Sequence, residues 1–412
     1  MKKHILVVAQ YFYPEQFRIN DICTEWVKRG YKVTVITGIP NYPQGKYYPG
    51  YGLLKKRKEI YNGIEIVRIP LIPRGNSSIM LALNYVSFVV SGFFWSLFTN
   101  IKADFVYIYE VSPMTQALPG VWYSIRRKIP CYIYVTDLWP ENVQIVTGIN
   151  NKFIINSIGK IVDYIYKRCN KIFTSSRSFI GAIKKRGVPE GKLEFWPQYA
   201  EDFYIPLKRQ DVEVKEIPND DKFNIIFAGN IGVAQGLDIL PKTASILKEK
   251  GQSVRFNIVG DGRFKETLVS MVNECNVEEM FNFINKQPAT RIPDFMAVCD
   301  AALVSLSKSE VFSITIPAKT QSCLACGIPM IVSADGEIQD IIRESGAGVC
   351  CEASNSKSLA DIICTIINKD DTELENMANK AYKYSNEKFN KNKLLDIMDN
   401  YFKDMNGEGK YV

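Results

Sequence analysis

The chain has 412 residues, which predicts two domains of roughly 200 residues each. Apolar residues make up 46% and charged residues 23%, so disordered, collagen-like and coiled-coil proteins are excluded. The only histidine, His4, lies in an apolar run and is expected to be packed, which excludes histidine-dependent zinc and nucleophile chemistry unless His4 itself acts. The ten cysteines are scattered and predict neither a disulfide framework nor a metal site.

The net charge of +7 is unevenly distributed. Residues 1–206 contain 27 Lys and Arg against 14 Asp and Glu, or +13, whereas the remainder has 24 against 30, or −6. A basic half predicts an anionic partner, either nucleic acid or a phospholipid surface. Because no helix-turn-helix, RNA-recognition or zinc motif accompanies the charge, we expect an anionic membrane surface and no nucleic acid.

Strand and helix patterns alternate through the first half of the chain. Short apolar runs predict strands, and Gln16–Gly30 predicts a helix that closes at its glycine. This alternation is typical of a parallel sheet with helices on both faces. The strands are expected at 5–9, 32–37, 105–109, 132–136 and 171–174.

The segment Ile79–Phe98 has about twenty residues without a charge and is long enough to span a bilayer. It also contains small and polar residues: Asn84, Ser87, Ser91, Gly92 and Ser96. We therefore expect a helix packed in the first half and partly immersed in a membrane interface, rather than a true span. The short apolar opening does not fit a signal peptide, so we expect a cytoplasmic protein, peripheral on the inner face of the plasma membrane.

The second half repeats the pattern after a linker expected at Glu201–Lys222. A helix is expected at 237–250, and strands at 224–228, 255–259, 281–284, 301–305 and 330–333. The predicted fold is therefore α/β, with two doubly wound Rossmann-like domains at 1–205 and 206–385. A last helix, about 386–405, is expected to pack back on the first. Ligands of such sheets lie beyond the carboxyl ends of the strands, so the cleft between the domains is the expected site.

Two glycine-rich turns follow the first two strands of this second half. One runs from Gly229 to Gly236, and the other is Gly260-Asp261-Gly262. Glycine lets the backbone approach a ligand, and a helix N-terminus offers N–H groups to phosphate. Neither turn is a GxGxxG fingerprint or a P-loop.

A lysine stands at an unusual place in the next motif. Pro317 and Gly327 are expected to begin and cap a helix, which puts Lys319 in its first turn. A cation there does not help the helix, so its position indicates an anion shared with the helix end. Cys323 and Cys326 have CxxC spacing without a second pair, and we interpret them as small core residues.

These motifs together resemble the retaining family-four glycosyltransferases with the GT-B fold. In the second half the resemblance rests on Gly229–Gly236, Gly260–Gly262, Ile316-Pro-Ala-Lys319 and Ala325-Cys-Gly-Ile-Pro329. The first half resembles a bacterial branch that includes N-acetyl-L-fucosamine transferases of surface-polysaccharide assembly. Its motifs are Tyr11-Phe-Tyr-Pro-Glu15, Pro40-Asn-Tyr-Pro-Gln-Gly45 and Asp137-Leu-Trp-Pro-Glu141.

The resemblance implies transfer with retention from a UDP-sugar, a nucleotide-sugar donor held by the second domain, with no cofactor and no obligatory metal. It implies an acceptor held by the first domain, and the +13 charge of residues 1–206 with the apolar segment 79–98 leads us to expect a polyprenyl-diphosphate-linked sugar as that acceptor. Lys286 would lie by the base, Lys319 and Ser322 near the ribose or diphosphate, and the other donor-binding residues would be Gly229, Asn230, Gly232, Gln235, Gly236, Gly260, Asp261 and Gly262.

Asp137 and Lys319 are the expected catalytic residues, and Glu15, Arg18, Asn41, Tyr42 and Glu141 are the expected acceptor-binding residues. Asp137 follows a strand where the cleft should open, but it could equally cap the helix that begins near Trp139. Arg18 could meet an acceptor pyrophosphate or lie on the surface.

The chain departs from the family at charged positions. Asn230 and Gln235 replace an arginine and a lysine, Ile314 and Ser322 replace a pair of glutamates, and Thr136-Asp137 replaces a histidine. Two alternatives therefore stay open. One is a UDP-sugar-binding subunit without activity; the other is a UDP-N-acetylhexosamine 2-epimerase of the same fold, against which the single histidine argues.

Overall fold

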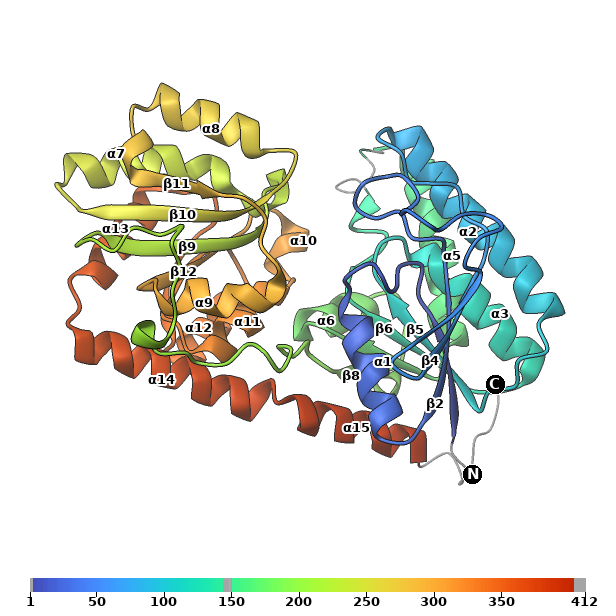
Figure 1. Ribbon diagram of the computed structural model, residues 1–412. Helices are drawn as coiled ribbons and strands as arrows, with labels where there is room; N and C mark the ends of the chain where they lie inside the picture. Colours follow the sequence, from blue (N-terminus) through green and yellow to red (C-terminus); the bar gives the residue numbers. More distant parts are fainter. Residues whose placement is uncertain (1–2, 144–147, 149, 404–412) are drawn as a thin grey trace. The chain divides into compact units, whose positions relative to one another are not determined.

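The computed structural model describes residues 3–143, 148 and 150–403, and divides the chain after Trp196 into two compact units. Each unit is a layered α/β domain with one central sheet (Figure 1). The division lies a few residues before the boundary predicted at 205. The fold class predicted from the alternating pattern is confirmed.

The first unit contains an eight-stranded sheet in the order β3-β4-β2-β1-β5-β6-β7-β8. Only β3 is antiparallel to its neighbour, and every other pairing is parallel. The strands are β1 (His4–Val8), β2 (Lys32–Thr37), β3 (Lys58–Tyr61), β4 (Ile64–Arg68), β5 (Phe105–Glu110), β6 (Cys131–Val135), β7 (Lys171–Thr174) and β8 (Leu193–Phe195).

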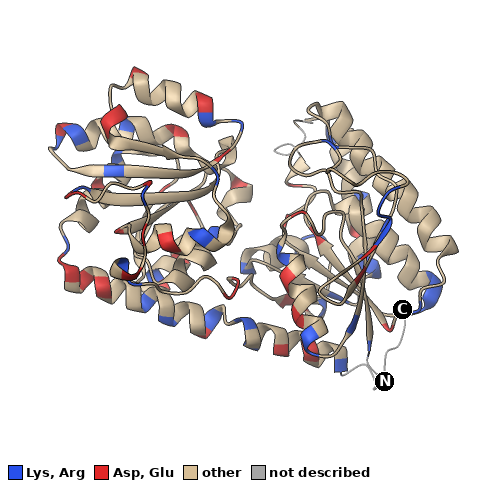
Figure 2. Cartoon of the chain, in the orientation of Figure 1, with Lys and Arg blue, Asp and Glu red and all other residues tan. Residues whose placement is uncertain are grey.

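Helices cover both faces of this sheet. In Figure 1, α1 lies on one face, and α2, α3 and α5 lie on the other. The helices of this unit are α1 (Arg18–Lys28), α2 (Ser78–Phe98), α3 (Leu118–Arg127), α5 (Lys152–Arg168) and α6 (Arg177–Lys184). Figure 2 shows α2 as a long helix without charged residues, whereas most other helices carry them.

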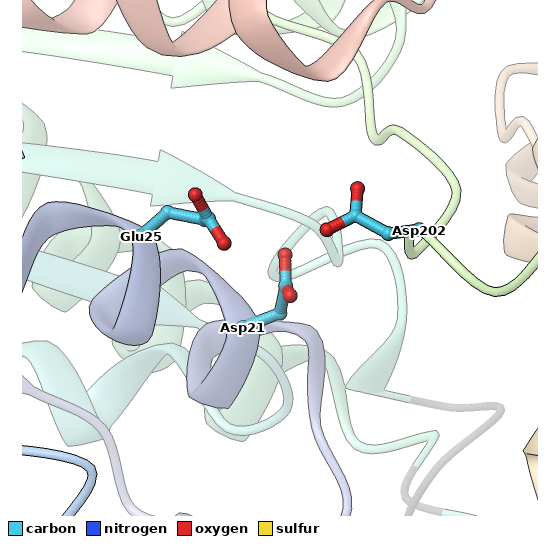
Figure 3. A group of neighbouring side chains, drawn as sticks. All are labelled: Asp21, Glu25 and Asp202. Carbon is cyan, nitrogen blue, oxygen red and sulfur yellow. The ribbon is translucent and has the colours of Figure 1, made fainter. Parts of the chain in front are cut away.

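His4 lies at the amino end of β1, away from the carboxyl ends of the strands. His4 begins β1 and is partly buried, and its ring hydrogen-bonds Thr34 Oγ1 at 2.8 Å and the Lys102 carbonyl at 2.5 Å, so it lies at the edge of the core. Asp21 and Glu25 lie one turn apart on α1 (Figure 3), and Glu25 pairs with Lys28 at 2.7 Å. Asp202, also drawn in Figure 3, belongs to the second unit.

The second unit has a six-stranded, wholly parallel sheet in the order β11-β10-β9-β12-β13-β14. The strands are β9 (Phe223–Asn230), β10 (Val254–Asp261), β11 (Phe281–Ile284), β12 (Ala301–Ser305), β13 (Met330–Ser333) and β14 (Gly348–Cys351). Residues from β9, β10, α7, α8 and α13 form its buried core.

Figure 1 shows α7, α8 and α13 on one face of this sheet and α9, α11 and α12 on the other, with α14 outside them. The helices are α7 (Leu240–Glu249), α8 (Lys265–Glu274), α9 (Ile292–Ala297), α10 (Glu310–Ser313), α11 (Ala318–Cys326), α12 (Glu337–Ser345), α13 (Ser356–Ile367), α14 (Asp371–Lys388) and α15 (Lys391–Lys403). Gly327 caps α11 with a φ of 63°, and Cys323 and Cys326 are buried, as predicted. The packing of a last helix on the first domain stays a prediction.

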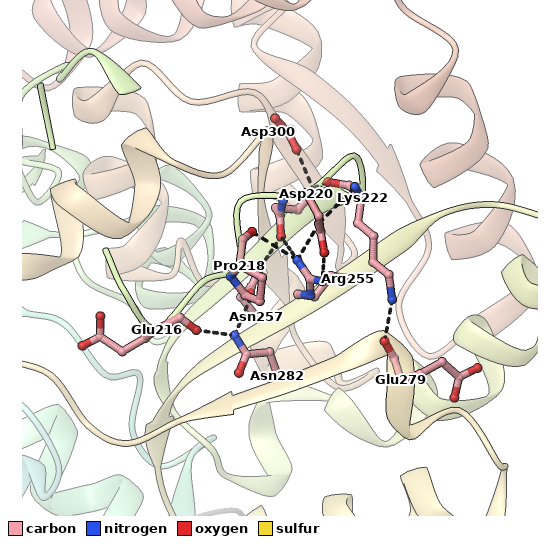
Figure 4. Close-up of polar contacts among 10 residues, drawn as sticks. Glu216, Pro218, Asp220, Lys222, Arg255, Asn257, Glu279, Asn282 and Asp300 are labelled. Atoms are coloured by element: carbon pink, nitrogen blue, oxygen red, sulfur yellow. Dashed lines mark hydrogen bonds and ion pairs between the residues drawn. The ribbon is translucent and has the colours of Figure 1, made fainter. Parts of the chain in front are cut away.

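The last part of the segment expected to be a linker is held against the second sheet by hydrogen bonds. Arg255 of β10 donates two hydrogen bonds to the carboxylate of Asp220, at 2.9 and 2.5 Å (Figure 4). Asn282 of β11 donates to the Glu216 carbonyl at 2.8 Å and to Asn257 Oδ1 at 3.0 Å. Because polar side chains from neighbouring strands hold this backbone, residues 216–222 are part of the second unit.

Candidate functional site

The carboxyl ends of β9 and β10 meet at an edge that only glycine can form. Gly229 is paired with Gly260, and both have positive φ angles, 149° and 153°. A Cβ atom at Gly260 would lie 1.9 Å from the Gly229 carbonyl oxygen, and one at Gly262 would lie 2.2 Å from the Ile231 carbonyl oxygen. The two strand ends therefore approach each other more closely than side chains allow. We call residues 229–236 and 260–262 the glycine edge.

The loop after β9 is held firmly by the end of β12. It contains a short 3-10 helix, Val233–Gln235, followed by Gly236 with a φ of 60°. Ser307 N–H donates to the Ala234 carbonyl at 3.0 Å, and the Ser307 hydroxyl donates to the Val233 carbonyl at 2.5 Å. A Cβ atom at Gly236 would lie 2.9 Å from the Leu306 backbone. The loop thus enters the site in one fixed path.

Lys319 brings an ammonium group to the glycine edge from α11, in which it is the second residue. Its Nζ donates a hydrogen bond to Gln235 Oε1 and lies 3.8 Å from the centre of the Phe227 ring. The position of a Cβ at Gly229 would be 3.7 Å from Nζ. Burial lowers the pKa of Lys319 to about 7. The structure therefore brings together Lys319, Gln235 and Gly229, as expected for an anion site.

The other predicted donor-binding residues differ in exposure. Asn230, Asp261 and Lys286 are exposed, and Asp261 Oδ1 accepts the Gly262 N–H at 2.8 Å. An open depression of about 610 Å³ adjoins the glycine edge, lined by Asp261, Gly262, Arg263, Lys265, Glu266 and Val269. Ser322 of α11 is buried, so its side chain is not open to the ribose or diphosphate that it was predicted to contact.

In the first unit, Asp137 lies just beyond β6 and is held by the loop after β5. Its Oδ2 atom accepts the Ser112 N–H at 2.9 Å and the Ser112 hydroxyl at 2.7 Å. Trp139 Nε1 in turn donates to the Ser112 hydroxyl at 3.0 Å. Burial raises the pKa of Asp137, although its hydrogen bonds to Ser112 favour the carboxylate. These contacts fix the carboxylate from a neighbouring loop, and they do not require Asp137 to cap a helix.

A second carboxyl group, Glu110, lies beneath Asp137 and was not predicted as a site residue. Glu110 ends β5, is fully buried, and accepts the Asp137 N–H at 3.4 Å. Its Oε1 atom has no hydrogen-bond partner among the described residues. Burial, with the charge of Asp137, raises the pKa of Glu110 well above its usual range. The available signal was an acidic residue at the carboxyl end of an apolar strand.

Glu15, predicted to bind an acceptor, supports a loop instead of facing solvent. Its carboxylate accepts backbone N–H groups from Asn41 at 2.8 Å, Tyr42 at 2.6 Å and Phe12 at 3.3 Å. Burial raises its pKa to about 7. Asn41 is also buried. The geometry therefore does not favour direct contact between either side chain and an acceptor. Tyr42, which they position, is exposed.

Arg74 is a cation that sequence reasoning missed. Its guanidinium lies 5.2 Å from the centre of the Tyr42 ring, and Nη1 donates to the Tyr11 hydroxyl at 3.2 Å. Asn41 Oδ1 accepts the Arg74 N–H at 2.9 Å. The Tyr85 hydroxyl is within electrostatic reach of both Arg74 and Asp137. We call Tyr42, Arg74, Tyr85 and Asp137 the Asp137 edge.

The remaining predicted residues of the first unit lie apart from these contacts. Arg18 is the first residue of α1 and is partly buried, and its charge acts on Tyr134 of β6. Glu141 is exposed after β6. Their predicted contact with an acceptor stays a prediction.

Comparison with known proteins identifies the second unit. Residues 208–384, which contain the glycine edge and Lys319, match the family described as Glycosyl transferases group 1. The second unit is therefore a glycosyltransferase domain. This glycosyltransferase is 24% identical to WcaI of Escherichia coli (strain K12), named for colanic acid biosynthesis, over 86% of this chain and 90% of that protein.

Solved structures confirm the GT-B fold of the glycosyltransferase. Sucrose-phosphate synthase from Thermosynechococcus elongatus matches with a TM-score of 0.74 at 13% identity, covering 98% of this chain and 99% of that chain. Anabaena Alr3699/HepE in complex with UDP and glucose matches with a TM-score of 0.69 at 16% identity, with the same coverages. At these identities the likeness concerns the fold alone.

Proposed function

We propose that this glycosyltransferase moves a sugar, with retention, from a UDP-sugar to a lipid-linked or oligosaccharide acceptor in bacterial surface-polysaccharide synthesis. The transferred sugar is an N-acetylated hexosamine or deoxyhexosamine. The acceptor is a polyprenyl-diphosphate-linked sugar, and the reaction needs neither a cofactor nor a metal. The proposed site of action is the cytoplasmic face of the plasma membrane.

The observation that carries the proposal is the position of Lys319 beside the glycine edge. Negative charge builds up on the diphosphate as its bond to the sugar breaks. Hydrogen-bond donors and a positive charge beside the diphosphate stabilise that transition state. The glycine edge allows close approach of backbone, and Lys319 supplies an ammonium group within contact of Gln235. Lys319 of α11 thus supplies a positive charge at a site where Asn230 and Gln235 stand in place of the family's arginine and lysine. The UDP bound by Alr3699/HepE supports a nucleotide donor.

The proposed reaction requires no histidine. The bond between the anomeric carbon and the diphosphate oxygen breaks, and the acceptor hydroxyl oxygen bonds to that carbon on the same face. The hydroxyl proton passes to the departing phosphate oxygen. Lys319 stabilises the charge on the leaving group, and Asp137 accepts a hydrogen bond from a second hydroxyl of the acceptor sugar, which orients the attacking one.

The acceptor half of the proposal rests on the Asp137 edge. Tyr42 offers an exposed ring, Arg74 a cation for a diphosphate, and Asp137 a carboxylate fixed by Ser112. The +13 charge of residues 1–206 and the identity with WcaI support an anionic, membrane-linked acceptor in polysaccharide synthesis.

Incubation with UDP-N-acetylhexosamines and a polyprenyl-diphosphate-linked sugar, followed by mass detection, tests the proposal. We expect a product heavier by one sugar residue and an equal amount of UDP. Tight UDP-sugar binding in calorimetry without UDP release would instead identify a binding subunit. Conversion of the donor to its 2-epimer would identify an epimerase.

A further inference from the structure

Helix α2 exposes apolar side chains on its outer side and buries mostly polar or small residues on its inner side. Its buried residues are Asn84, Tyr85, Phe88, Gly92 and Ser96, of which all but Phe88 are polar or small. The exposed residues are almost all apolar. The outer face, as we call it, consists of Ile79, Leu83, Val86, Val90, Phe93, Phe94, Leu97 and Phe98.

The exposure of this outer face is large. Its eight side chains are between 41% and 76% exposed, and they recur at spacings of three and four over residues 79–98, with two adjacent pairs at 93–94 and 97–98. At 1.5 Å per residue the stripe extends over about 29 Å. Contiguous apolar surface of this size on a soluble chain marks an interaction site, because exposure to water is unfavourable.

We infer that the outer face of α2 binds the interface of an anionic phospholipid bilayer, with the helix axis lying along the membrane. The occupant is the lipid surface itself. This inference deepens the proposed function, since it names the residues that would bring the enzyme to a lipid-linked acceptor.

Charge around the helix favours a bilayer over a protein partner. Residues 75–101 contain no charged side chain, so nothing on α2 opposes insertion. The neighbouring end of α3 carries the cations Arg126, Arg127 and Lys128. Arg126 donates to the carbonyls of Leu97 and Thr99 at 2.7 Å each, which fixes a guanidinium at the end of α2. Cations beside an apolar stripe match anionic headgroups beside acyl chains.

Although α2 is long and apolar enough to span a membrane, its inner face packs against the rest of the first unit. A Cβ atom at Gly92 would lie 2.2 Å from the Pro119 side chain of α3. Asn84 accepts a hydrogen bond from Gln10 Nε2 at 2.8 Å and donates to the Ile72 carbonyl at 2.6 Å. The helix is therefore part of the first unit and offers only one side to lipid.

The start of α2 also links the membrane to the site. Arg74, in the Asp137 edge, precedes the first residue of the helix, Ser78, by four positions. An acceptor whose hydrocarbon lies in the bilayer would present its diphosphate near this edge. The position of α2 thus agrees with a lipid-linked substrate.

Vesicle sedimentation of the full chain tests the inference. We expect the protein to sediment with vesicles of equimolar phosphatidylcholine and phosphatidylglycerol, and less with phosphatidylcholine alone. The double substitution Val86→Glu and Phe94→Glu should lower the bound fraction constant at least about tenfold. The matched control is Tyr382→Glu on α14, also exposed and apolar, which should bind like the unsubstituted protein.

Tryptophan quenching by brominated lipid gives a second readout. Trp26, Trp139 and Trp196 are buried, whereas Trp95 of α2 and Trp122 of α3 are partly exposed. Fluorescence should therefore be quenched by brominated phosphatidylglycerol vesicles, and the Trp95→Phe, Trp122→Phe double variant should lose that quenching. Unchanged UDP affinity in all variants shows that the second unit remains folded.

Three results would overturn the inference. The protein could stay in the supernatant with both vesicle types, the Val86→Glu, Phe94→Glu variant could bind vesicles equally well, or the unsubstituted chain could be a dimer that this variant dissociates. The assay needs no sugar donor. Vesicle binding without sugar transfer would therefore reject the proposed function and leave this inference standing.

Discussion

The buried position of Lys319 predicts that donor binding weakens as the pH rises above neutrality. Its pKa in the free protein is about 7, because burial disfavours the ammonium form. A bound diphosphate favours that form and should bring the pKa back towards the ordinary lysine value of about 10.4. UDP binding would then take up a proton above pH 7.

The size of the effect follows from the fraction of Lys319 that is charged. That fraction is about one half at pH 7 and about one hundredth at pH 9, so the affinity for UDP should fall roughly 50-fold. This corresponds to about 2.3 kcal/mol at 1.36 kcal/mol per pKa unit. The contribution is present below pH 7 and is lost as the pH rises through it.

Isothermal titration calorimetry with UDP between pH 7 and pH 9 measures the change. Lys319→Arg should bind with little pH dependence, because its guanidinium stays charged. Lys319→Met should bind weakly throughout and should lower the transfer rate by about 100-fold or more. The control Lys242→Met removes an exposed lysine of α7 and should change nothing. A dissociation constant for the unsubstituted protein that varies less than twofold over this range would refute the reasoning.

Three further predictions concern other parts of the chain. Asp137→Asn should lower kcat for sugar transfer by about 100-fold with UDP affinity unchanged, because the carboxylate lies in the first unit; equal kcat would remove Asp137 from the mechanism. Gly260→Ala places a Cβ 1.9 Å from a neighbouring carbonyl oxygen and should cost about 3 kcal/mol or more in urea unfolding, whereas Gly191→Ala, with nothing within 4 Å, should cost little. Arg255→Met leaves Asp220 without its bidentate partner and should make residues 216–222 sensitive to limited proteolysis, where an unchanged digestion pattern would contradict the fixed-segment interpretation.

Most strands could be predicted because buried parallel strands are nearly continuous apolar runs. β2, β7, β11, β12 and β13 have the predicted bounds. The hairpin of β3 and β4 was missed because its apolar residues alternate with polar ones, although Asn62-Gly63, both with positive φ, form the Asn-Gly turn that is typical of a hairpin. An edge hairpin has less apolar sequence to indicate it than a central strand.

A site residue could be predicted from the sequence only where its charge was unfavourable for the element that carries it. Lys319 could be found because a cation at a helix start is unfavourable unless an anion is near. Arg74 and Ser112 could not be found in this way, since their roles come from contacts with residues far along the chain. Glu110 offered one signal, an acidic residue at the end of an apolar strand, but its contact with Asp137 could not be predicted. The supporting role of Glu15 depends likewise on a loop 26 positions away.

Helix α2 shows a different limit. Its length and apolar character predicted a helix, and its polar and small residues recur on one side. Such a pattern defines two faces, but it does not tell which face meets the protein. The answer depends on α3, whose Pro119 packs against Gly92.

The close approach of the two strand ends at the glycine edge also limits how the donor specificity of this enzyme could change. The backbone there tolerates no added carbon, so insertions or new side chains at Gly260 and Gly262 would disrupt folding before they altered selectivity. The side chains of Asn230 and Gln235, in contrast, can vary without moving the main chain. Libraries that aim to change donor preference should therefore randomise these two positions and leave the loop length as it is.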